Sequence, residues 1–297
     1  MIQKLGFAAN DRLLIINADD FGMTKGTNEA IVHLFEKNSI TSTSIMIPCM
    51  DSTEAMAVSR LKGMKDIGIH LTLTSDELNP YAPVYDKRAL HSLITTEGHF
   101  HTDVALFERN ADEDEVLLEM ESQIRCAILN GIDPTHLDNH AGSILGLFTG
   151  RDFLELSFDL CEKYRLPFLL PNRIVEQPLF NTDQRRLFQK RINSAKGRKI
   201  LLIDDIVSLP YCFNPVIPYS KLKKQLEDTL SNIKPGITQL TLHPSKITDQ
   251  LMGITSCYKE REMEYRLLND SDIKRLFRRE RIKLISWRDI RDLQRSM

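Results

Sequence analysis

Residues 13–22 read LLIINADDFG, an apolar run that ends in two adjacent carboxylates, Asp19 and Asp20. The pattern predicts a buried strand that leads into a reactive loop, because α/β chains place their chemistry at the carboxyl ends of their strands. Two neighbouring carboxylates are costly there unless a positive group lies between or beside them. We therefore expect another part of the chain to bring such a group to this strand end.

Composition and charge exclude several classes of protein. The chain has 297 residues, 42% hydrophobic and 27% charged, which is ordinary for a globular protein with a large core. A formal net charge of -2 provides no basic field for nucleic acid, and Arg278, Arg279 and Arg281 are expected on a solvated helix face. The start of the chain lacks the apolar core of a signal peptide, and no apolar run approaches membrane-spanning length. We expect a soluble cytoplasmic protein, with neither nucleic acid nor a membrane as a partner.

The five cysteines are scattered and show no CxxC spacing. This pattern argues against a disulfide framework and against a thiolate metal site. It is typical of proteins from a reducing compartment.

A strand-then-helix rhythm repeats along the chain. The strand at 13–22 is followed by predicted strands at 41–47, 66–73, 135–140, 167–170, 199–207, 236–243 and 282–286. Helices are expected after Thr27 (as its cap), from Asp51 to Gly63 with a capping box to Glu54, and at 113–130, 153–164, 183–194, 220–233, 258–279 (two stretches) and from 288 onward. No tight hairpin signal interrupts this order, so we predict a single α/β domain over residues 1–297, with parallel strands closing into a barrel.

One long segment, 74–112, is rich in Pro, Asp, His and Thr and has no sustained periodicity. Loops of this length in a compact domain are usually functional lids or disordered. Its three histidines, His91, His99 and His101, are expected to be solvated, although one could close over a ligand.

Three other strand ends carry histidines. His70 alternates with Ile67, Ile69 and Leu71, so it is expected to face the barrel interior. A lone strand histidine is more often a satisfied core or surface group than a ligand. His243 faces inward by the same alternation, just before Pro244 breaks its strand.

The third strand end, THLDNH, places His136, Asp138 and His140 on one side of an extended segment. An imidazole and a carboxylate on one face suit a metal ligand and the group that orients it. One carboxylate plus two histidines with open positions is the pattern of a catalytic divalent cation, which would also stabilise the adjacent Asp19 and Asp20. The other groups then fit hydrolase roles: an aspartate that takes a proton from water and a histidine that protonates a leaving nitrogen.

At this point the motifs NADDFG, GIHLTL, HLDNH and a late HP, in this order, resemble the YdjC-like carbohydrate deacetylases of the ChbG and HpnK type. The resemblance covers residues 13–287. It implies a modified (β/α) TIM-like barrel of about seven or eight mostly parallel strands, related to the broader polysaccharide deacetylases. It also implies removal of an N-acetyl group from an amino sugar or oligosaccharide, and a homodimer.

Site roles follow from the same resemblance. It implies one divalent metal ion held by Asp20, His70 and His140, with Mg²⁺ favoured and Zn²⁺ or another transition metal left open. By analogy with the wider deacetylase group, Asp19 would be the general base and His243 the general acid. His136 and Asp138 are placed behind the ligands or next to the substrate.

The chain also departs from the family. Some members read HLDSHHHVH, whereas this chain reads HLDNHAGSI, and an arginine that many members carry after YRLPF is replaced by Leu169 and Leu170, with Arg173 nearby. A second carboxylate pair, Asp204 and Asp205, has no inward histidine in sequence and is interpreted as structural or substrate-facing. Trp287 could stack on a sugar or pack in the core.

Two other functions remain open at this stage. A sugar-binding or regulatory protein would keep the fold and the metal but turn over poorly, and the missing histidines are its only hint. A metal phosphoesterase would need a second metal about 3.5–4 Å from the first, or more cationic clamps than Lys25 and Lys246.

Overall fold

The strands form one parallel sheet that curves into a half-barrel. The structure is a computed structural model that describes residues 1–76, 78–212 and 217–297. Within these residues the strand order is β4-β3-β2-β1-β6-β5, and β7 pairs with the start of β1. The strands are β1 (Arg12–Phe21), β2 (Ser42–Ile45), β3 (Ile67–Leu71), β4 (Leu137–Asn139), β5 (Asp205–Ser208), β6 (Gly236–Leu242) and β7 (Ile282–Leu284). All registered pairs are parallel, which confirms the predicted α/β barrel-like class.

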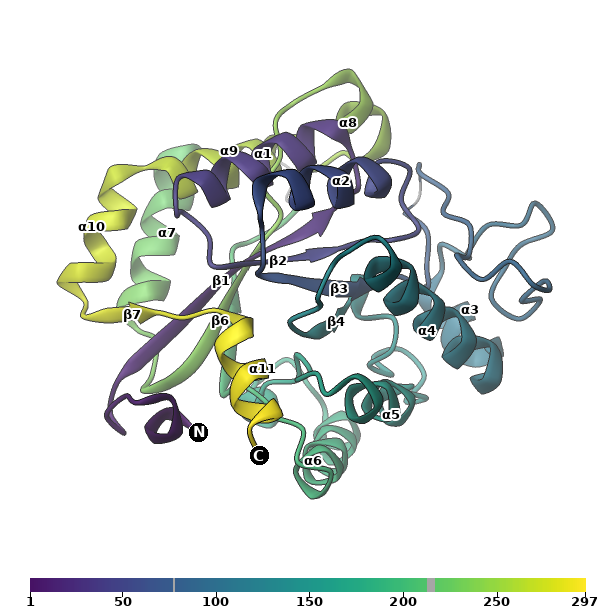
Figure 1. Ribbon diagram of the computed structural model, residues 1–297. Helices are drawn as coiled ribbons and strands as arrows, with labels where there is room; N and C mark the ends of the chain where they lie inside the picture. Colours follow the sequence, from purple (N-terminus) through teal and green to yellow (C-terminus); the bar gives the residue numbers. More distant parts are fainter. Residues whose placement is uncertain (77, 213–216) are drawn as a thin grey trace.

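The helices surround this sheet, and the two termini lie close together (Figure 1). They are α1 (Lys25–Glu36), α2 (Ser52–Lys62), α3 (Val104–Asn110), α4 (Glu113–Leu129), α5 (Leu154–Tyr164), α6 (Thr182–Gly197), α7 (Tyr219–Ser231), α8 (Asp249–Ile254), α9 (Tyr258–Asn269), α10 (Ser271–Arg279) and α11 (Trp287–Arg295). The predicted helices are all present. The sequence missed α3 and α8, which are too short to show a periodic pattern. None of the described helices combines the length and apolar character that a membrane crossing needs.

Two predicted strands are largely absent as strands. Residues 167–170 contribute only an isolated bridge between Leu137 and Phe168, and the strand expected at 199–207 is confined to β5. Prolines at both ends of the first segment have no N–H to donate, so a longer ladder cannot form. The segment still joins the two edges of the sheet, because Leu169 N–H donates to Leu137 O and Asn172 N–H donates to Ile203 O.

The two predicted helix starts were also wrong in detail. Thr24, not Thr27, caps α1, and its hydroxyl accepts a hydrogen bond from Thr27 N–H. Asp51 begins α2 without a side-chain cap, because its carboxylate instead accepts a hydrogen bond from Gln250 Nε2.

The inner face of the half-barrel changes from apolar to polar along β1. At one end Leu13 and Ile15 belong to a small buried cluster with Trp287. At the other end, Asn17 and Asp19 follow on the same face by the two-residue repeat of a strand. The apolar cluster around Trp287 therefore fills one end of the half-barrel, while the polar side chains lie at the carboxyl ends of the strands.

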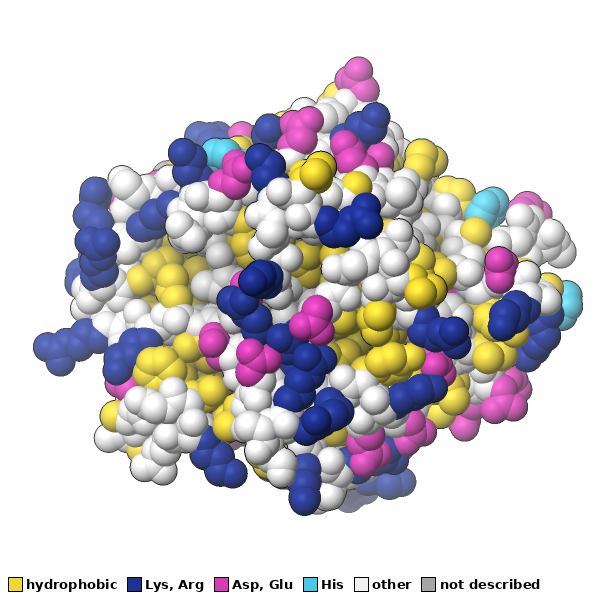
Figure 2. Space-filling view, viewed as in Figure 1, with side chains coloured by type: hydrophobic (Ala, Val, Ile, Leu, Met, Phe, Trp, Pro, Cys, Tyr) yellow, Lys and Arg dark blue, Asp and Glu magenta, His cyan; other side chains and the backbone are white. Residues whose placement is uncertain are grey.

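Basic and acidic side chains are interspersed on the face shown in Figure 2, and basic ones gather around α11. Three arginines of α11 are paired there with aspartates, Arg288 with Asp66 and both Arg291 and Arg295 with Asp133. This cluster is thus an ion-pair network at the helix, in which each arginine already has an acidic partner.

Candidate metal and catalytic site

A cavity of about 530 Å³ opens at the carboxyl ends of the strands. Five of the predicted site residues line it: Asp19 and Asp20 at the end of β1, His70 in β3, His140 just after β4 and His243 just after β6. Since these strands are parallel, their carboxyl ends meet at one edge, which brings residues far apart in sequence together.

Asp20 reaches the cavity through an unusual backbone conformation. In a regular strand, Asp19 and Asp20 would point to opposite faces. Asp20 has a φ of 66°, and the register between β1 and β2 shifts between Ala18 and Phe21. This local irregularity turns both carboxylates toward the same cavity.

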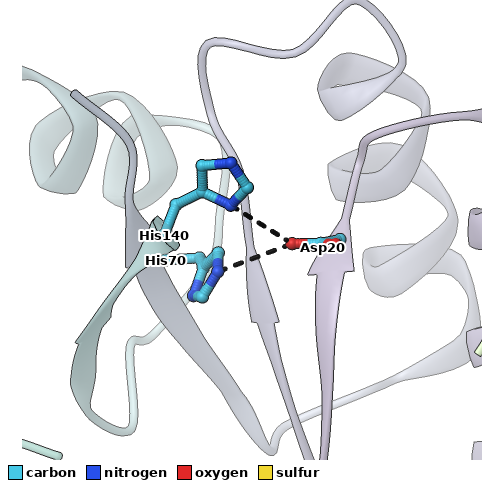
Figure 3. Close-up of side chains that lie close together, drawn as sticks. All are labelled: Asp20, His70 and His140. Carbon is cyan, nitrogen blue, oxygen red and sulfur yellow. Dashed lines mark ion pairs between the residues drawn. The ribbon is translucent and has the colours of Figure 1, made fainter. Parts of the chain in front are cut away.

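Asp20 and two histidines form a compact, buried group (Figure 3). Asp20 Oδ1 lies 3.5 Å from His70 Nε2 and 3.6 Å from His140 Nδ1. This oxygen is buried and has no hydrogen-bond partner among the described residues. An unpartnered carboxylate oxygen facing two imidazole nitrogens fits a divalent cation, and this donor set suits several metals.

The other oxygen of Asp20 is held by Arg261 of α9. Arg261 Nη2 donates to Asp20 Oδ2 at 2.7 Å, and both side chains are almost completely buried. Burial opposes ionisation, but the charge of Arg261 and the nearby imidazole of His140 hold the pKa of Asp20 well below its usual range. Asp20 is therefore an ionised group whose Oδ1 alone is left for a ligand.

Each of the two histidines is also held at its second ring nitrogen. His70 Nδ1 lies 2.9 Å from Asp138 Oδ1, and His140 Nε2 lies 3.1 Å from Asp76 Oδ1. Carboxylates in this position fix the tautomer and ring orientation of a metal-binding histidine.

Asp19 lies beside this group and is 6% exposed. Asn17 Nδ2 donates to Asp19 Oδ1 at 2.6 Å, and Asp19 Oδ2 is 4.0 Å from His70 Nε2. Burial raises the pKa of Asp19 to about 7, against the opposing charge of His70. A carboxyl with a pKa in this range is suited to proton transfer near neutral pH.

His243 approaches from the neighbouring strand. Its backbone N–H donates to Glu264 Oε2 at 2.5 Å, and its ring centroid is 4.7 Å from that of Tyr211. Burial lowers the pKa of His243 to about 4, so its ring is neutral at pH 7 in the protein without ligands.

A scan against protein families gives a match to the YdjC-like protein family over residues 13–279. The chain belongs to the YdjC-like family. The match spans every residue that lines the cavity at the strand ends. The resemblance inferred from the four motifs is thereby confirmed.

Curated relatives of this YdjC-like protein align over nearly their whole length. A carbohydrate deacetylase of Thermoanaerobacter pseudethanolicus is 27% identical over 276 residues, which is 93% of this chain and 98% of the relative. A carbohydrate deacetylase of Enterococcus faecalis is 26% identical over 282 residues, 95% of this chain and 99% of the relative. Among solved structures, one described as a putative cellobiose-phosphate cleavage protein of Enterococcus faecalis has a TM-score of 0.75 at 25% identity, covering 94% and 99% of the two chains.

The remaining two predicted residues of the YdjC-like protein lie behind the cavity. Asp138 contacts His70, and His136 Nε2 lies 3.5 Å from Asp138 Oδ2. The His136 ring is fully buried and stacks on Trp287 with ring centroids 4.6 Å apart. Gly68 is required beside it, because any Cβ at that position would overlap the imidazole. Trp287 is thus a core residue, and neither ring lines the cavity.

Sequence reasoning missed several residues of the cavity wall. Asp76 lies in the long segment that has no periodicity, and Arg261 lies in a helix whose many charges read as an exposed surface. Tyr211 belongs to the loop that follows β5. Of these residues, Arg261 alone left a signal in the sequence, because it occupies a position of α9 that is buried in the fold. The helical pattern of charges did not single it out.

The second carboxylate pair, Asp204 and Asp205, has structural partners away from the cavity. Asp204 Oδ2 accepts a hydrogen bond from Ile237 N–H, and Asp205 pairs with Arg173 at 3.7 Å. The three histidines of the long segment do not line the cavity in the part of the chain that the structure describes. Glu77, in the same segment, lies outside the described residues.

The cysteine pattern argued against a disulfide framework, and one pair departs from this expectation. Cys212 and Cys257 form a disulfide that links the loop after β5 to the start of α9. Their loops meet at the cavity although 45 residues separate them in sequence, a proximity that cysteine spacing cannot reveal. The other three cysteines are free.

Proposed function

We propose that this YdjC-like protein is a metal-dependent carbohydrate deacetylase that removes the N-acetyl group of an amino sugar or oligosaccharide. The observation that carries the proposal is the buried, unpartnered Asp20 Oδ1 facing nitrogens of His70 and His140. The full-length similarity to proteins named carbohydrate deacetylase supports the same activity. The names of the aligned relatives support a carbohydrate substrate, and the possible metal-binding group in the cavity supports metal-assisted hydrolysis.

Asp20, His70 and His140 would hold the ion. A divalent ion held there would polarise the acyl carbonyl and lower the pKa of a water molecule. We infer Mg²⁺ from the family, and Zn²⁺ or another transition metal has the same donor set available.

Asp19 and His243 would move the protons. They directly follow the paired residues Ala18 and Leu242, so Asp19 near the end of β1 and His243 just after β6 occupy adjacent positions. Asp19 would take a proton from the attacking water, and His243 would pass a proton to the leaving nitrogen. Because the ring of His243 is neutral at pH 7 in the free protein, it would first receive the proton that Asp19 takes from the attacking water and then pass that proton to the leaving nitrogen. Both side chains would then be back in their starting protonation states, and the proton gained by the amine would come from water.

The cavity gives little support to a phosphoesterase. The second group of potential ligands, Asp19, His70 and Asp138, shares His70 with the first, so it does not describe a separate metal position. Arg261 is the one arginine or lysine among the described residues that line the cavity, and it is paired with Asp20. Lys246 pairs with Glu29 instead.

We test the proposal by acetate release from a panel of N-acetylated mono- and oligosaccharides, plain and phosphorylated, after chelation and stepwise return of Mg²⁺, Mn²⁺ and Zn²⁺. Metal-dependent release that is abolished in Asp20→Ala and His70→Ala, and kept in the loop control His91→Ala, supports it. Release that survives chelation and both substitutions contradicts it. Metal binding without release from any sugar would indicate a binding or regulatory protein.

A second comparison separates the two proton-transfer roles. His243→Asn should lose much less activity on an acetyl compound whose leaving group needs no proton than on an N-acetylated sugar. Asp19→Asn should lose activity on both. Equal losses of His243→Asn on the two substrates would contradict its role as the acid.

Other features stay predictions. We propose that residues 1–297 form one domain that acts as a homodimer in the cytoplasm, with no nucleic acid or membrane as partner. Size-exclusion chromatography with light scattering measures the molar mass in solution and so tests the homodimer directly.

A further inference from the structure

The two ring nitrogens of His140 face two different carboxylates. Nδ1 lies 3.6 Å from Asp20 Oδ1, on the side of the proposed ion. Nε2 lies 3.1 Å from Asp76 Oδ1, on the opposite side of the ring. An imidazole with one nitrogen on a carboxylate has a fixed tautomer, which leaves the other nitrogen free to bind a metal.

Asp76 is itself held in place. Tyr81 Oη donates to Asp76 Oδ2 at 2.6 Å, so each carboxylate oxygen has its own partner. Tyr81 is 2% exposed, its N–H donates to Ser75 Oγ, and its carbonyl accepts a hydrogen bond from Phe100 N–H. The fold of the long segment thus fixes the carboxylate that contacts His140.

His70 shows the same arrangement with residues from a recognised motif. Its Nδ1 contacts Asp138, and its Nε2 faces Asp20 Oδ1 at 3.5 Å. The two histidines therefore use opposite nitrogens toward Asp20, and each has one carboxylate on its far side. Asp76 therefore holds His140 in the way that Asp138 holds His70.

We propose that Asp76 is a positioning residue for His140, and that the segment 74–112 belongs to the active site through it. This inference rests on the proposed metal site. Asp76 sets the ring orientation and raises the basicity of His140, and Tyr81 sets the position of Asp76. The side chain of Asp76 is 28% exposed and lines the cavity, so direct contact with substrate is the competing role to be tested.

The experiment measures Mn²⁺ affinity by titration calorimetry on the full chain, together with kcat and KM for acetate release. Asp76→Asn keeps the shape but loses the charge, and Asp76→Ala loses both. We expect Asp76→Asn to bind Mn²⁺ about 10-fold more weakly and Asp76→Ala up to about 100-fold more weakly. Excess Mn²⁺ should restore most of kcat in Asp76→Asn without a change in KM.

Two further variants make the test decisive. Tyr81→Phe should weaken Mn²⁺ binding in the same direction but less, and it replaces the test if the Asp76 variants fail to fold. Asp86→Asn is the matched control, because Asp86 is exposed in the same segment and does not line the cavity. It should match the wild type.

The experiment distinguishes a failure of the positioning role of Asp76 from a failure of the proposed function. Wild-type Mn²⁺ affinity in Asp76→Asn, or in Tyr81→Phe where that variant stands in, overturns the positioning role even if the wild type is a metal-dependent deacetylase. A raised KM with unchanged Mn²⁺ affinity also overturns it and assigns Asp76 to the substrate. A wild-type protein that binds no Mn²⁺ and releases acetate without metal refutes the proposed function itself.

Discussion

Asp20 depends on one backbone conformation and one side-chain partner. The left-handed φ of a non-glycine residue costs roughly 1–2 kcal/mol and is typical of functional sites. Arg261 offsets the cost of burying the carboxylate by pairing with Oδ2. The combination presents a single oxygen of Asp20 to the cavity.

Substitution Arg261→Gln should therefore destabilise the fold. It removes the partner of a buried charge, for which the expected loss in the free energy of unfolding is about 3 kcal/mol. Urea denaturation in the presence of chelator measures this loss without a contribution from bound metal. Arg266→Gln, an exposed arginine on the same helix, is the control and should cost well under about 1 kcal/mol. Equal stability of the two variants would show that the buried pair contributes nothing.

Some of the site could be predicted at this scale and some could not. The alternation of apolar and polar residues placed His70 and His243 on the inward face of their strands, and the structure brings both to the cavity. Asp20 reaches the cavity only because the alternation fails there, and a local backbone rotation leaves no mark on the pattern. Asp76 and Arg261 depend on tertiary contacts, which periodicity does not report.

At the scale of elements, helix α4 organises the long segment through a polar line next to its apolar stripe. Glu115, Glu119 and Gln123 are spaced four residues apart and are all buried. Glu115 accepts a hydrogen bond from the backbone of Ser92, and Glu119 accepts hydrogen bonds from the N–H groups of Val84 and Tyr85. Segment 74–112 is thus tethered by carboxylates that accept backbone N–H groups.

The sequence predicts this helix from an apolar stripe, of which Val116, Met120 and Ile124 are buried, whereas Ile128 is 42% exposed. The polar line was not recognised, because charged residues on a helix usually face solvent. A segment held by side-chain to backbone hydrogen bonds has no periodic pattern of its own, so its order could not be predicted from its composition. Long helices were predicted for the opposite reason, since their packing repeats every turn.

Glu119 should make stability depend on pH. Burial raises its pKa to about 7 from an ordinary value of 4.5, although the backbone N–H groups of Val84 and Tyr85 oppose this shift. Between these two values the folded state binds more protons than the unfolded state, so stability falls as the pH rises through 4.5 to 7. The whole effect is at most about 3 kcal/mol.

The variant Glu119→Gln should lack this decline. Urea denaturation from pH 5 to 8 should show the stability of the wild type falling relative to the variant. Glu121→Gln is a control without a decline in this range, because a hydrogen bond from Lys163 lowers the pKa of Glu121 below 4.5 and its contribution to stability is therefore already complete at pH 5. A pH-independent difference between the wild type and Glu119→Gln would refute the assignment of a raised pKa.

For the whole molecule, the strand-then-helix order was enough to predict parallel strands and a cavity at their carboxyl ends. The half-barrel is less regular than that order implied, since residues 167–173 replace a strand with a bridge and two backbone hydrogen bonds. The disulfide between Cys212 and Cys257 ties two walls of the cavity together. Such closures depend on which loops meet, and the chain order does not specify that.

The proposed ion would join parts of the chain that fold from distant sequence. Asp20, His70 and His140 come from β1, β3 and the turn after β4, so an unfolded chain cannot present them together. A ligand that binds only the folded state stabilises it by about 2.7 kcal/mol at 100 times its Kd. For a chain of this size we expect a rise in Tm of roughly 5 °C.

Differential scanning calorimetry with and without Mn²⁺ measures this shift. His91→Ala should show the full rise and Asp20→Ala should show none, because only the second variant removes a ligand atom. A rise of equal size in Asp20→Ala would mean that Mn²⁺ stabilises the protein at another position. Since the readout is independent of turnover, it separates a metal site built into the fold from the identity of the sugar.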